Sequence, residues 1–258
     1  MLHYKERANK TLSWRGTDTI KNYKNVTNGV PNPYSMTEIQ YTYNSSGFRC
    51  DEFDLPSDIP IVFLGCSFTE GIGLHQHETW AYQFLTRIRT VTGVNIPYWN
   101  LGLGASGVDT AARHLYLFSK TNKFVYVFGL LPGMHRRELG YDTDKYNLVI
   151  PSDPYNKYLA KINELLVDTS FIQQQSEKSL MLIDAVRQIQ QPYVSLWTRD
   201  PEGEVAAFPD LNLNYYAKID IDLARDGQHP GPKWHERLTD TMWEKHKHLF
   251  GAHIRPRT

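Results

Sequence analysis

The chain is poor in cysteine and has neither an excess of charge nor a long apolar run, and each shortage excludes a class of protein. Two cysteines among 258 residues, Cys50 and Cys66, are too few for a disulfide framework or a cysteine-rich metal centre. The 28 basic and 28 acidic residues give a formal net charge of zero, so bulk charge provides no attraction to nucleic acid. No stretch approaches the roughly 18 continuous apolar residues that span a bilayer.

The first residues, 1–7, also lack the apolar core of a secretory signal peptide. Together these absences predict a cytoplasmic protein with reduced thiols and with neither a nucleic-acid nor a membrane partner. Export by a route that leaves no mark in the sequence is the alternative, and the oligomeric state is left open.

Apolar runs and amphipathic stretches alternate along most of the chain, after a polar and irregular arm over residues 1–35. We expect strands at 39–44, 59–64, 96–101, 124–128 and 193–197, and helices at 78–91, 108–120, 155–167, 170–190 and 232–249. This alternation predicts one domain over residues 36–258, a three-layer α/β/α sandwich around a flavodoxin-like parallel sheet. A loop at 140–154 and the two helices after it form a predicted helical insertion at about 140–190.

Ser67 follows directly on the buried strand expected at 59–64. Gly65 and Gly71 flank it, so the chain can turn tightly and expose the serine hydroxyl. The start of the next helix would then present free backbone N–H groups to a developing negative charge. A serine that only caps a helix explains this segment equally well when it is taken alone.

Asp226 and His229 stand three residues apart in a loop just ahead of the last predicted helix. A serine nucleophile needs a base within hydrogen-bond reach, and the base needs an acceptor that fixes its tautomer. One short loop can supply both groups if it folds against the turn at Ser67. An ordinary surface turn rich in Gly and Pro is the simpler reading of this loop by itself.

Three segments, taken together, resemble the sequence blocks of the SGNH (GDSL-like) hydrolase family. They are Gly65-Cys66-Ser67-Phe68-Thr69, Asn100-Leu101-Gly102 and Asp226-Gly227-Gln228-His229-Pro230, and they occur in the family's order. The segment Tyr43-Asn44-Ser45-Ser46-Gly47-Phe48-Arg49 is similar to the lead-in of some members. The resemblance implies an esterase that forms a covalent acyl-serine and uses neither a metal nor an organic cofactor.

The resemblance also implies a role for each residue of the site. Ser67 would attack an acyl carbonyl, His229 would take the serine proton, and Asp226 would orient His229. The backbone N–H of Ser67 would form part of the oxyanion hole together with a second N–H group. Family spacing points to Ala105 as this second donor, whereas Gly104 is the nearest glycine, and both stay open.

The family's third block is degenerate in this chain. Its Gly-x-Asn-Asp pattern falls on Gly129-Leu130-Leu131-Pro132, so Leu131 replaces the asparagine whose side chain donates to the oxyanion. Loss of one such donor costs about 100- to 1000-fold in turnover. Arg136 is our preferred replacement donor, with His135 and Arg137 beside it, although solvated loop charges explain all three equally well.

Other patterns compete with this interpretation. Residues 102–107 have the Gly-x-Gly-x-x-Gly spacing of a dinucleotide site, but the acidic residue expected about 20 positions later is missing. His75 and His77 could face one side of an extended segment, yet no third ligand is evident, so we predict no metal site. Thr69 stands where the nucleophile elbow of α/β-hydrolases needs glycine.

The sequence therefore predicts a serine esterase that acts on a small ester, with an O-acetylated carbohydrate as the first substrate class to test. One alternative is an acyltransferase that uses the same triad and a sugar hydroxyl as acceptor. The other is a non-catalytic binding or structural protein on an SGNH scaffold, which Leu131 favours. The acyl group and the alcohol of the substrate are left open.

Overall fold

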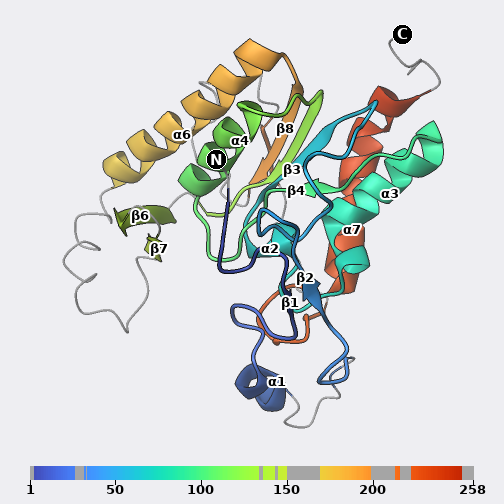
Figure 1. The fold of residues 1–258 in the computed structure, drawn as a ribbon, viewed down its shortest axis with the longest axis vertical. Coiled ribbons are helices and arrows are strands. Elements are labelled where there is room, and N and C mark those ends of the chain that lie inside the picture. Colours follow the sequence, from blue (N-terminus) through green and yellow to red (C-terminus); the bar gives the residue numbers. More distant parts are fainter. Residues whose placement is uncertain are drawn as a thin grey trace.

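A parallel sheet lies at the centre of the computed structural model, which describes residues 3–26, 32, 34–133, 136–142, 145–149, 169–198, 213–215 and 222–251. Its five strands are β3 (Ile61–Gly65), β4 (Trp99–Asn100), β5 (Tyr126–Leu130), β8 (Tyr193–Thr198) and β9 (Leu213–Tyr215). They are all parallel and lie in the order β4-β3-β5-β8-β9 (Figure 1). Relative to the chain this is the order 2-1-3-4-5 of flavodoxin-like sheets, so the predicted fold class is confirmed.

Helices cover both faces of the sheet (Figure 1). One face carries α4 (Val108–Ser119) and α6 (Thr169–Gln190), and the other carries α3 (Trp80–Thr92) and α7 (Pro232–His246). Each pair packs over its own apolar cluster. Val62 and Leu64 of β3 belong to the first cluster, and Ile61 and Phe63 belong to the second, because successive side chains of a strand point to opposite faces.

The amino-terminal arm has regular structure of its own. Its β1 (Thr11–Leu12) pairs antiparallel with β2 (Tyr41–Thr42), which lies beyond the arm, and its α1 (Ile20–Val26) follows β1 in the chain. The start of the arm reaches the sandwich, where the hydroxyl of Tyr4 lies 2.6 Å from His114 Nε2 on α4. The arm therefore packs on the domain instead of extending from it.

The segment predicted as a helical insertion differs from the prediction in its described parts. Where a loop was expected, β6 (Arg137–Asp142) and β7 (Lys145–Val149) form an antiparallel hairpin. The helix expected at 155–167 lies outside the described residues. In α6, Leu180, Ile183 and Val186 join the apolar cluster beside α4, so this helix is a layer of the sandwich.

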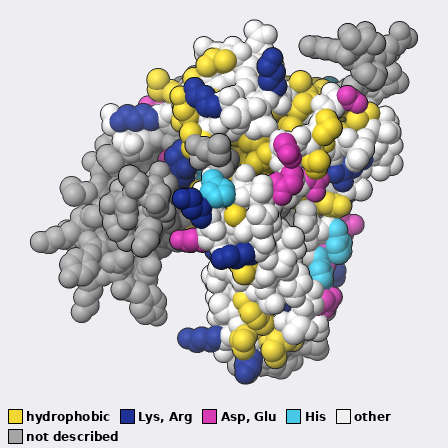
Figure 2. All heavy atoms as spheres, viewed as in Figure 1, with side chains coloured by type: hydrophobic (Ala, Val, Ile, Leu, Met, Phe, Trp, Pro, Cys, Tyr) yellow, Lys and Arg dark blue, Asp and Glu magenta, His cyan; other side chains and the backbone are white. Residues whose placement is uncertain are grey.

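The surface matches the balanced composition. On the face shown in Figure 2, the described acidic and basic side chains are interspersed with uncharged surface. Among the described residues, no helix is both long and apolar enough to cross a bilayer.

Candidate active site

Ser67 opens a four-residue helix, α2 (Ser67–Glu70), directly after β3. The chain turns at Gly65, whose φ is 153°. A Cβ at this position would lie 2.0 Å from Thr69 Oγ1 and 2.6 Å from the carbonyl oxygen of Leu130, so the turn requires glycine. The serine is 6% exposed, and its Oγ lies 4.0 Å from Cys66 Sγ.

Arg49 supports the end of this turn. Its buried guanidinium donates to the carbonyl oxygens of Glu70 and Gly71 at 3.1 and 2.6 Å, and to that of Leu74 at 2.8 Å. Carbonyl groups at the end of a helix have no partner within the helix, so this side chain supplies one. The lead-in segment noted in the sequence thus has a structural function.

Asp226 and His229 form a hydrogen-bonded pair in the loop before α7. His229 Nδ1 lies 2.6 Å from Asp226 Oδ2, while Asp226 Oδ1 accepts the backbone N–H groups of Gln228 and His229 at 3.0 Å each. Burial would raise the pKa of the Asp226 carboxyl, but the hydrogen bonds from His229 and Thr17 outweigh it and hold the pKa at about 2. The carboxylate is therefore ionised at neutral pH and accepts a hydrogen bond from His229 Nδ1–H.

The Asp226 loop lies beside the serine turn. The His229 ring packs edge-on against Phe68, the residue after Ser67, with centroids 5.6 Å apart. The N–H of Arg225 donates to the carbonyl oxygen of Gly73 at 2.9 Å, which fixes the loop on the chain that follows α2. Within the described residues no hydrogen bond joins Ser67 to His229, and catalytic hydrogen bonds are often long before substrate binds.

The second sequence block also packs on the serine turn. Asn100 Nδ2 donates to the carbonyl oxygen of Thr69 at 2.7 Å, and Asn100 Oδ1 accepts the N–H of Gly102 at 2.8 Å. The hydroxyl of Ser106 donates to the carbonyl oxygen of Gly65 at 3.2 Å. The loop after β4 is thus held against the residues that precede and follow Ser67.

The two candidate oxyanion donors in this loop differ in their contacts. The N–H of Gly104 is donated to the carboxylate of Glu70. Ala105 is exposed, with φ at 65°, and its N–H makes no hydrogen bond among the described residues. The N–H of Ser67 is likewise not engaged in the part of the chain that the structure describes. Of the three candidate donors in the described part of the chain, Ser67 and Ala105 therefore have N–H groups free for a ligand, whereas that of Gly104 is engaged.

Glu70 is a buried anion that the sequence analysis missed. It is 1% exposed, and its Oε1 lies 3.1 Å from Arg15 Nε, 2.7 Å from the hydroxyl of Tyr43 and 3.7 Å from Arg7 Nη1. Burial alone would raise the pKa of Glu70, but Arg15 and Arg7, with the hydrogen bonds from Tyr43 and Gly104, hold the pKa at about 2. Glu70 is thus a charged anchor for the loop after β4.

This anchor also bears on the dinucleotide alternative. The N–H of Gly104 would have to face a pyrophosphate in such a site, but it faces the carboxylate of Glu70. A buried anion at that place would repel the phosphate charge.

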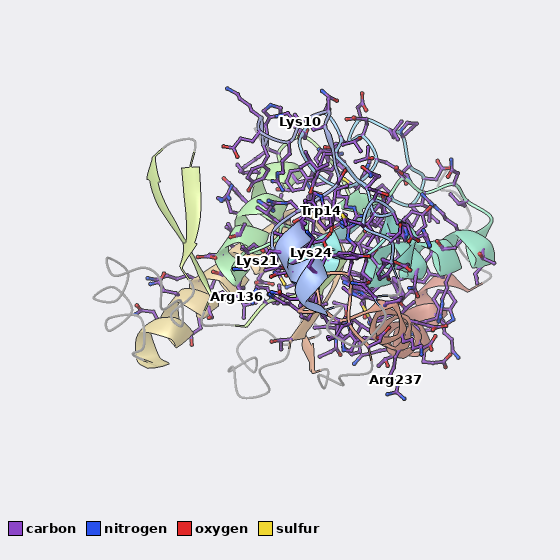
Figure 3. The ribbon with its side chains drawn as sticks, turned by 90° about the horizontal axis from the view of Figure 1, so that it is seen from below. Lys10, Trp14, Lys21, Lys24, Arg136 and Arg237 are labelled. Atoms are coloured by element: carbon purple, nitrogen blue, oxygen red, sulfur yellow. The ribbon has the colours of Figure 1, made fainter. Side chains whose placement is uncertain are left out.

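Leu131 has the environment of a core residue. It is 1% exposed within the apolar cluster under α4 and α6, and its N–H donates to the carbonyl oxygen of Trp197 at 2.8 Å. The predicted replacement, Arg136, lies where α4 begins, since a Cβ on Gly107 would be 2.6 Å from its carbonyl oxygen (Figure 3). His135 and the side chain of Arg137 lie outside what the structure describes. A role for Arg136 at the oxyanion stays a prediction.

Thr17 of the amino-terminal arm also reaches the site, and no sequence pattern singled it out. Its hydroxyl donates to Asp226 Oδ2 at 2.6 Å and lies 3.2 Å from His229 Nδ1. This contact joins residues 209 positions apart in the chain.

The histidines weighed as metal ligands are engaged with each other. The rings of His75 and His77 stack with centroids 5.3 Å apart, and His75 Nε2 lies 3.1 Å from Glu38 Oε1. Across the described ranges, no three His, Cys, Asp or Glu side chains are grouped so as to hold a metal ion.

Comparison with known proteins returns structures but no sequence relatives. No protein-family model and no curated protein matches the chain. It is similar in structure to the psychrotrophic esterase EstA from Pseudoalteromonas sp., at 15% identity, with 74% of this chain and 97% of that chain covered and a TM-score of 0.47. It is also similar to TesA, at 12% identity, with 74% of this chain and 99% of that chain covered and a TM-score of 0.45. For the family 3 carbohydrate esterase of Clostridium thermocellum the identity is 15%, the covered shares are 74% of this chain and 96% of that chain, and the TM-score is 0.45. The structural neighbours are SGNH/GDSL-type esterases at low identity, and the likeness concerns the fold alone.

Proposed function

We propose that this protein is a serine ester hydrolase in which Ser67 is the nucleophile and Asp226 and His229 form the acid–base pair. The observation that carries the proposal is the 2.6 Å contact between His229 Nδ1 and an ionised, buried Asp226, on a loop whose histidine ring packs against the residue after Ser67. A buried carboxylate that fixes Nδ1–H leaves Nε2 as the nitrogen that can accept a proton.

The reaction follows from these groups. Ser67 Oγ attacks the acyl carbonyl carbon while its proton moves to His229 Nε2, and the Asp226 carboxylate stabilises the imidazolium. The same proton then passes to the departing alcohol oxygen as the ester bond breaks, which leaves an acyl group on Ser67. Water attacks that acyl group with His229 as base, and the carboxylic acid and free serine are released.

The N–H groups of Ser67 and Ala105 are the donors we assign to the oxyanion. Gly104 is the weaker candidate, because its N–H is donated to Glu70. Leu131, in the core, cannot supply the family's third donor, and without a replacement donor we expect turnover about 100- to 1000-fold below that of an enzyme with a complete oxyanion hole. Arg136 is our proposed third donor, and its replacement by Met tests that assignment through kcat.

The substrate class we propose is a small ester, with an O-acetyl group on a carbohydrate first among the candidates. The alternative function is a non-catalytic binding protein on the same scaffold. The burial of Leu131 favours it, because the side chain at this position cannot donate to an oxyanion.

Turnover of p-nitrophenyl acetate separates the two functions. We expect wild type to hydrolyse it and Ser67→Ala and His229→Ala to lose about 1000-fold or more in kcat. Ser119→Ala, at the far end of α4, and His248→Ala, on the exposed carboxyl-terminal turn, are matched controls that should retain wild-type turnover. Equal rates in all five proteins would exclude the esterase function. The products formed with and without a sugar acceptor would distinguish hydrolysis from acyl transfer.

A further inference from the structure

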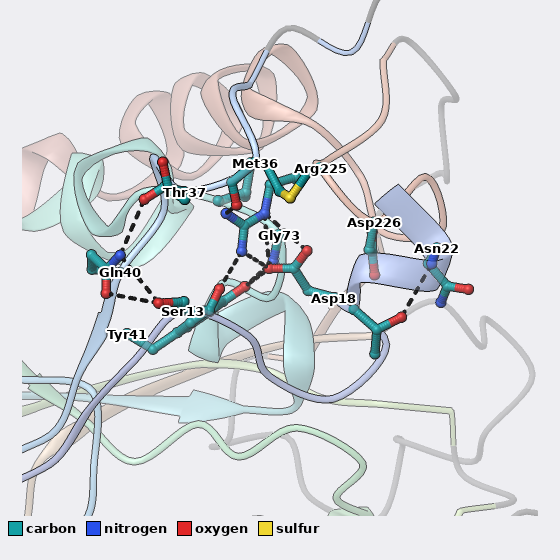
Figure 4. A network of polar contacts seen from close by, with 12 residues as sticks. Ser13, Asp18, Asn22, Met36, Thr37, Gln40, Tyr41, Gly73, Arg225 and Asp226 are labelled. Carbon is teal, nitrogen blue, oxygen red and sulfur yellow. Dashed lines mark hydrogen bonds and ion pairs between the residues drawn. The ribbon is translucent and has the colours of Figure 1, made fainter. Parts of the chain in front are cut away.

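The amino-terminal arm is fixed to the Asp226 loop by a buried ion pair. Arg225 and Asp18 are each 0% exposed, with Arg225 Nη2 2.5 Å and Arg225 Nε 3.0 Å from the Asp18 carboxylate oxygens (Figure 4). Arg225 also donates to the carbonyl oxygen of Ser13 at 2.6 Å, and Asp18 accepts the hydroxyl of Tyr41 at 2.5 Å. Arg225 directly precedes Asp226 in the chain, and Asp18 directly follows Thr17. The ion pair therefore sets the position of the arm against the Asp226 loop.

Thr17 lies between fixed points in this arrangement. Its neighbour Asp18 is held by Arg225, and its own carbonyl oxygen accepts Asn22 Nδ2 at 2.7 Å (Figure 4). Arg15 and Asp18 enclose Thr17 in the chain, and their backbone groups exchange two hydrogen bonds of 3.0 Å each. The backbone around Thr17 therefore holds its side chain toward the Asp226 loop.

The hydroxyl of Thr17 completes the contacts of the Asp226 carboxylate. Oδ1 accepts the N–H groups of Gln228 and His229, and Oδ2 accepts both the Thr17 hydroxyl and His229 Nδ1–H. With two donors on each oxygen, the carboxylate has a single orientation that satisfies all of them. The threonine oxygen also lies 3.2 Å from His229 Nδ1, so it limits the tilt of the ring.

We propose that Thr17 is a positioning residue, whose hydroxyl fixes the Asp226 carboxylate so that His229 keeps Nδ1 on it and Nε2 toward Ser67. This inference rests on the proposed function, since it concerns the same acid–base pair. Thr17 touches neither the substrate nor the reacting atoms and acts through Asp226. The amino-terminal arm thereby becomes a part of the active site.

The test compares Thr17→Val with Thr17→Ser. Valine has the shape of threonine without the hydroxyl, and serine keeps the hydroxyl. We expect Thr17→Val to lower kcat for p-nitrophenyl acetate about 10-fold with KM within about twofold, because the acid–base pair loses orientation rather than substrate contacts. Thr17→Ser should recover kcat to within about threefold of wild type.

Thr19→Val is the matched control on the same arm. The hydroxyl of Thr19 accepts the N–H of Asn22 at 3.1 Å, at the start of α1. Its loss weakens the arm without touching Asp226, so we expect wild-type kcat. If Thr17→Val retains wild-type kcat, or if Thr19→Val and Thr17→Ser lose as much as Thr17→Val, the positioning inference is wrong.

A spectroscopic readout keeps this test independent of turnover. We expect the Nδ1 proton of His229 to give a far-downfield NMR signal that persists in wild type, Thr17→Ser and Thr19→Val and shifts and broadens in Thr17→Val. Should wild type not hydrolyse esters, the proposed function fails while this signal still tests the positioning role. An unchanged signal in Thr17→Val overturns the inference in either case.

Discussion

Replacement of Glu70 by glutamine should change how the stability of the protein depends on pH. The carboxylate is 1% exposed and is bound by Arg15, Arg7 and Tyr43, and by the N–H of Gly104. These partners hold its pKa at about 2 in the folded protein, against an ordinary value of 4.5. Glutamine has nearly the same shape and does not titrate.

The size of the effect follows from this shift. Because the folded pKa lies below the unfolded one, the stabilisation is complete above pH 4.5 and amounts to about 3 kcal/mol. As the pH falls, the unfolded chain takes up the proton first, and about 2 kcal/mol of this contribution is lost by pH 3. The remainder disappears below pH 2.

Urea unfolding at pH 7 and pH 3 measures the difference. We expect the loss of unfolding free energy between these pH values to be about 2 kcal/mol smaller in Glu70→Gln than in wild type. Glu236→Gln, at an exposed position on α7, is the control and should show the wild-type loss. If Glu70→Gln also shows the wild-type loss, Glu70 is not the charged anchor described above.

Three further predictions concern the turn, the core and the acid–base pair. Gly65→Ala should lower the free energy of unfolding by about 3 kcal/mol or more, because its Cβ would meet Thr69 Oγ1 and the carbonyl oxygen of Leu130. Gly93→Ala, at φ 69° with open space around it, should cost only about 1 kcal/mol in the same urea assay, and equal losses would contradict the steric argument. Leu131→Asn should cost about 2–4 kcal/mol and leave kcat no higher, because the amide would be buried in an apolar cluster, whereas a gain in kcat would show that residue 131 reaches the oxyanion. Asp226→Asn should lower kcat about 10,000-fold at pH 7, because the amide no longer fixes the Nδ1–H tautomer of His229. A loss of kcat below tenfold would contradict the assigned role of Asp226 and His229 as the acid–base pair.

The fold could be predicted because a parallel sheet covered on both sides needs strands that are apolar throughout. The run at 59–64 became β3 at Ile61–Gly65, and the periodic stretch at 170–190 became α6 at Thr169–Gln190. The three residues of β9 are too few to show a period, and they are a strand because β8 lies beside them. The segments of β6 and β7, six and five residues long, were mistaken for a loop because polar and charged residues interrupt their apolar ones.

The site could be predicted only where its residues belong to short sequence motifs. Ser67, Asp226 and His229 carry such motifs, and the structure brings their segments together. Thr17 and the partners of Glu70 depend on how a distant arm packs, which no local pattern encodes. The choice between Gly104 and Ala105 likewise depends on a tertiary contact to Glu70.

Covalent labelling of the native protein tests whether Ser67 is the nucleophile. The full chain is treated with a fluorophosphonate, and the modified residue is located by mass spectrometry of its peptides. We expect one phosphonyl group on Ser67, no adduct on Ser67→Ala, and labelling of His229→Ala slowed about 1000-fold, because the serine loses its base. A native protein that takes up no label on Ser67, or a His229→Ala variant labelled as fast as wild type, would contradict the proposed function.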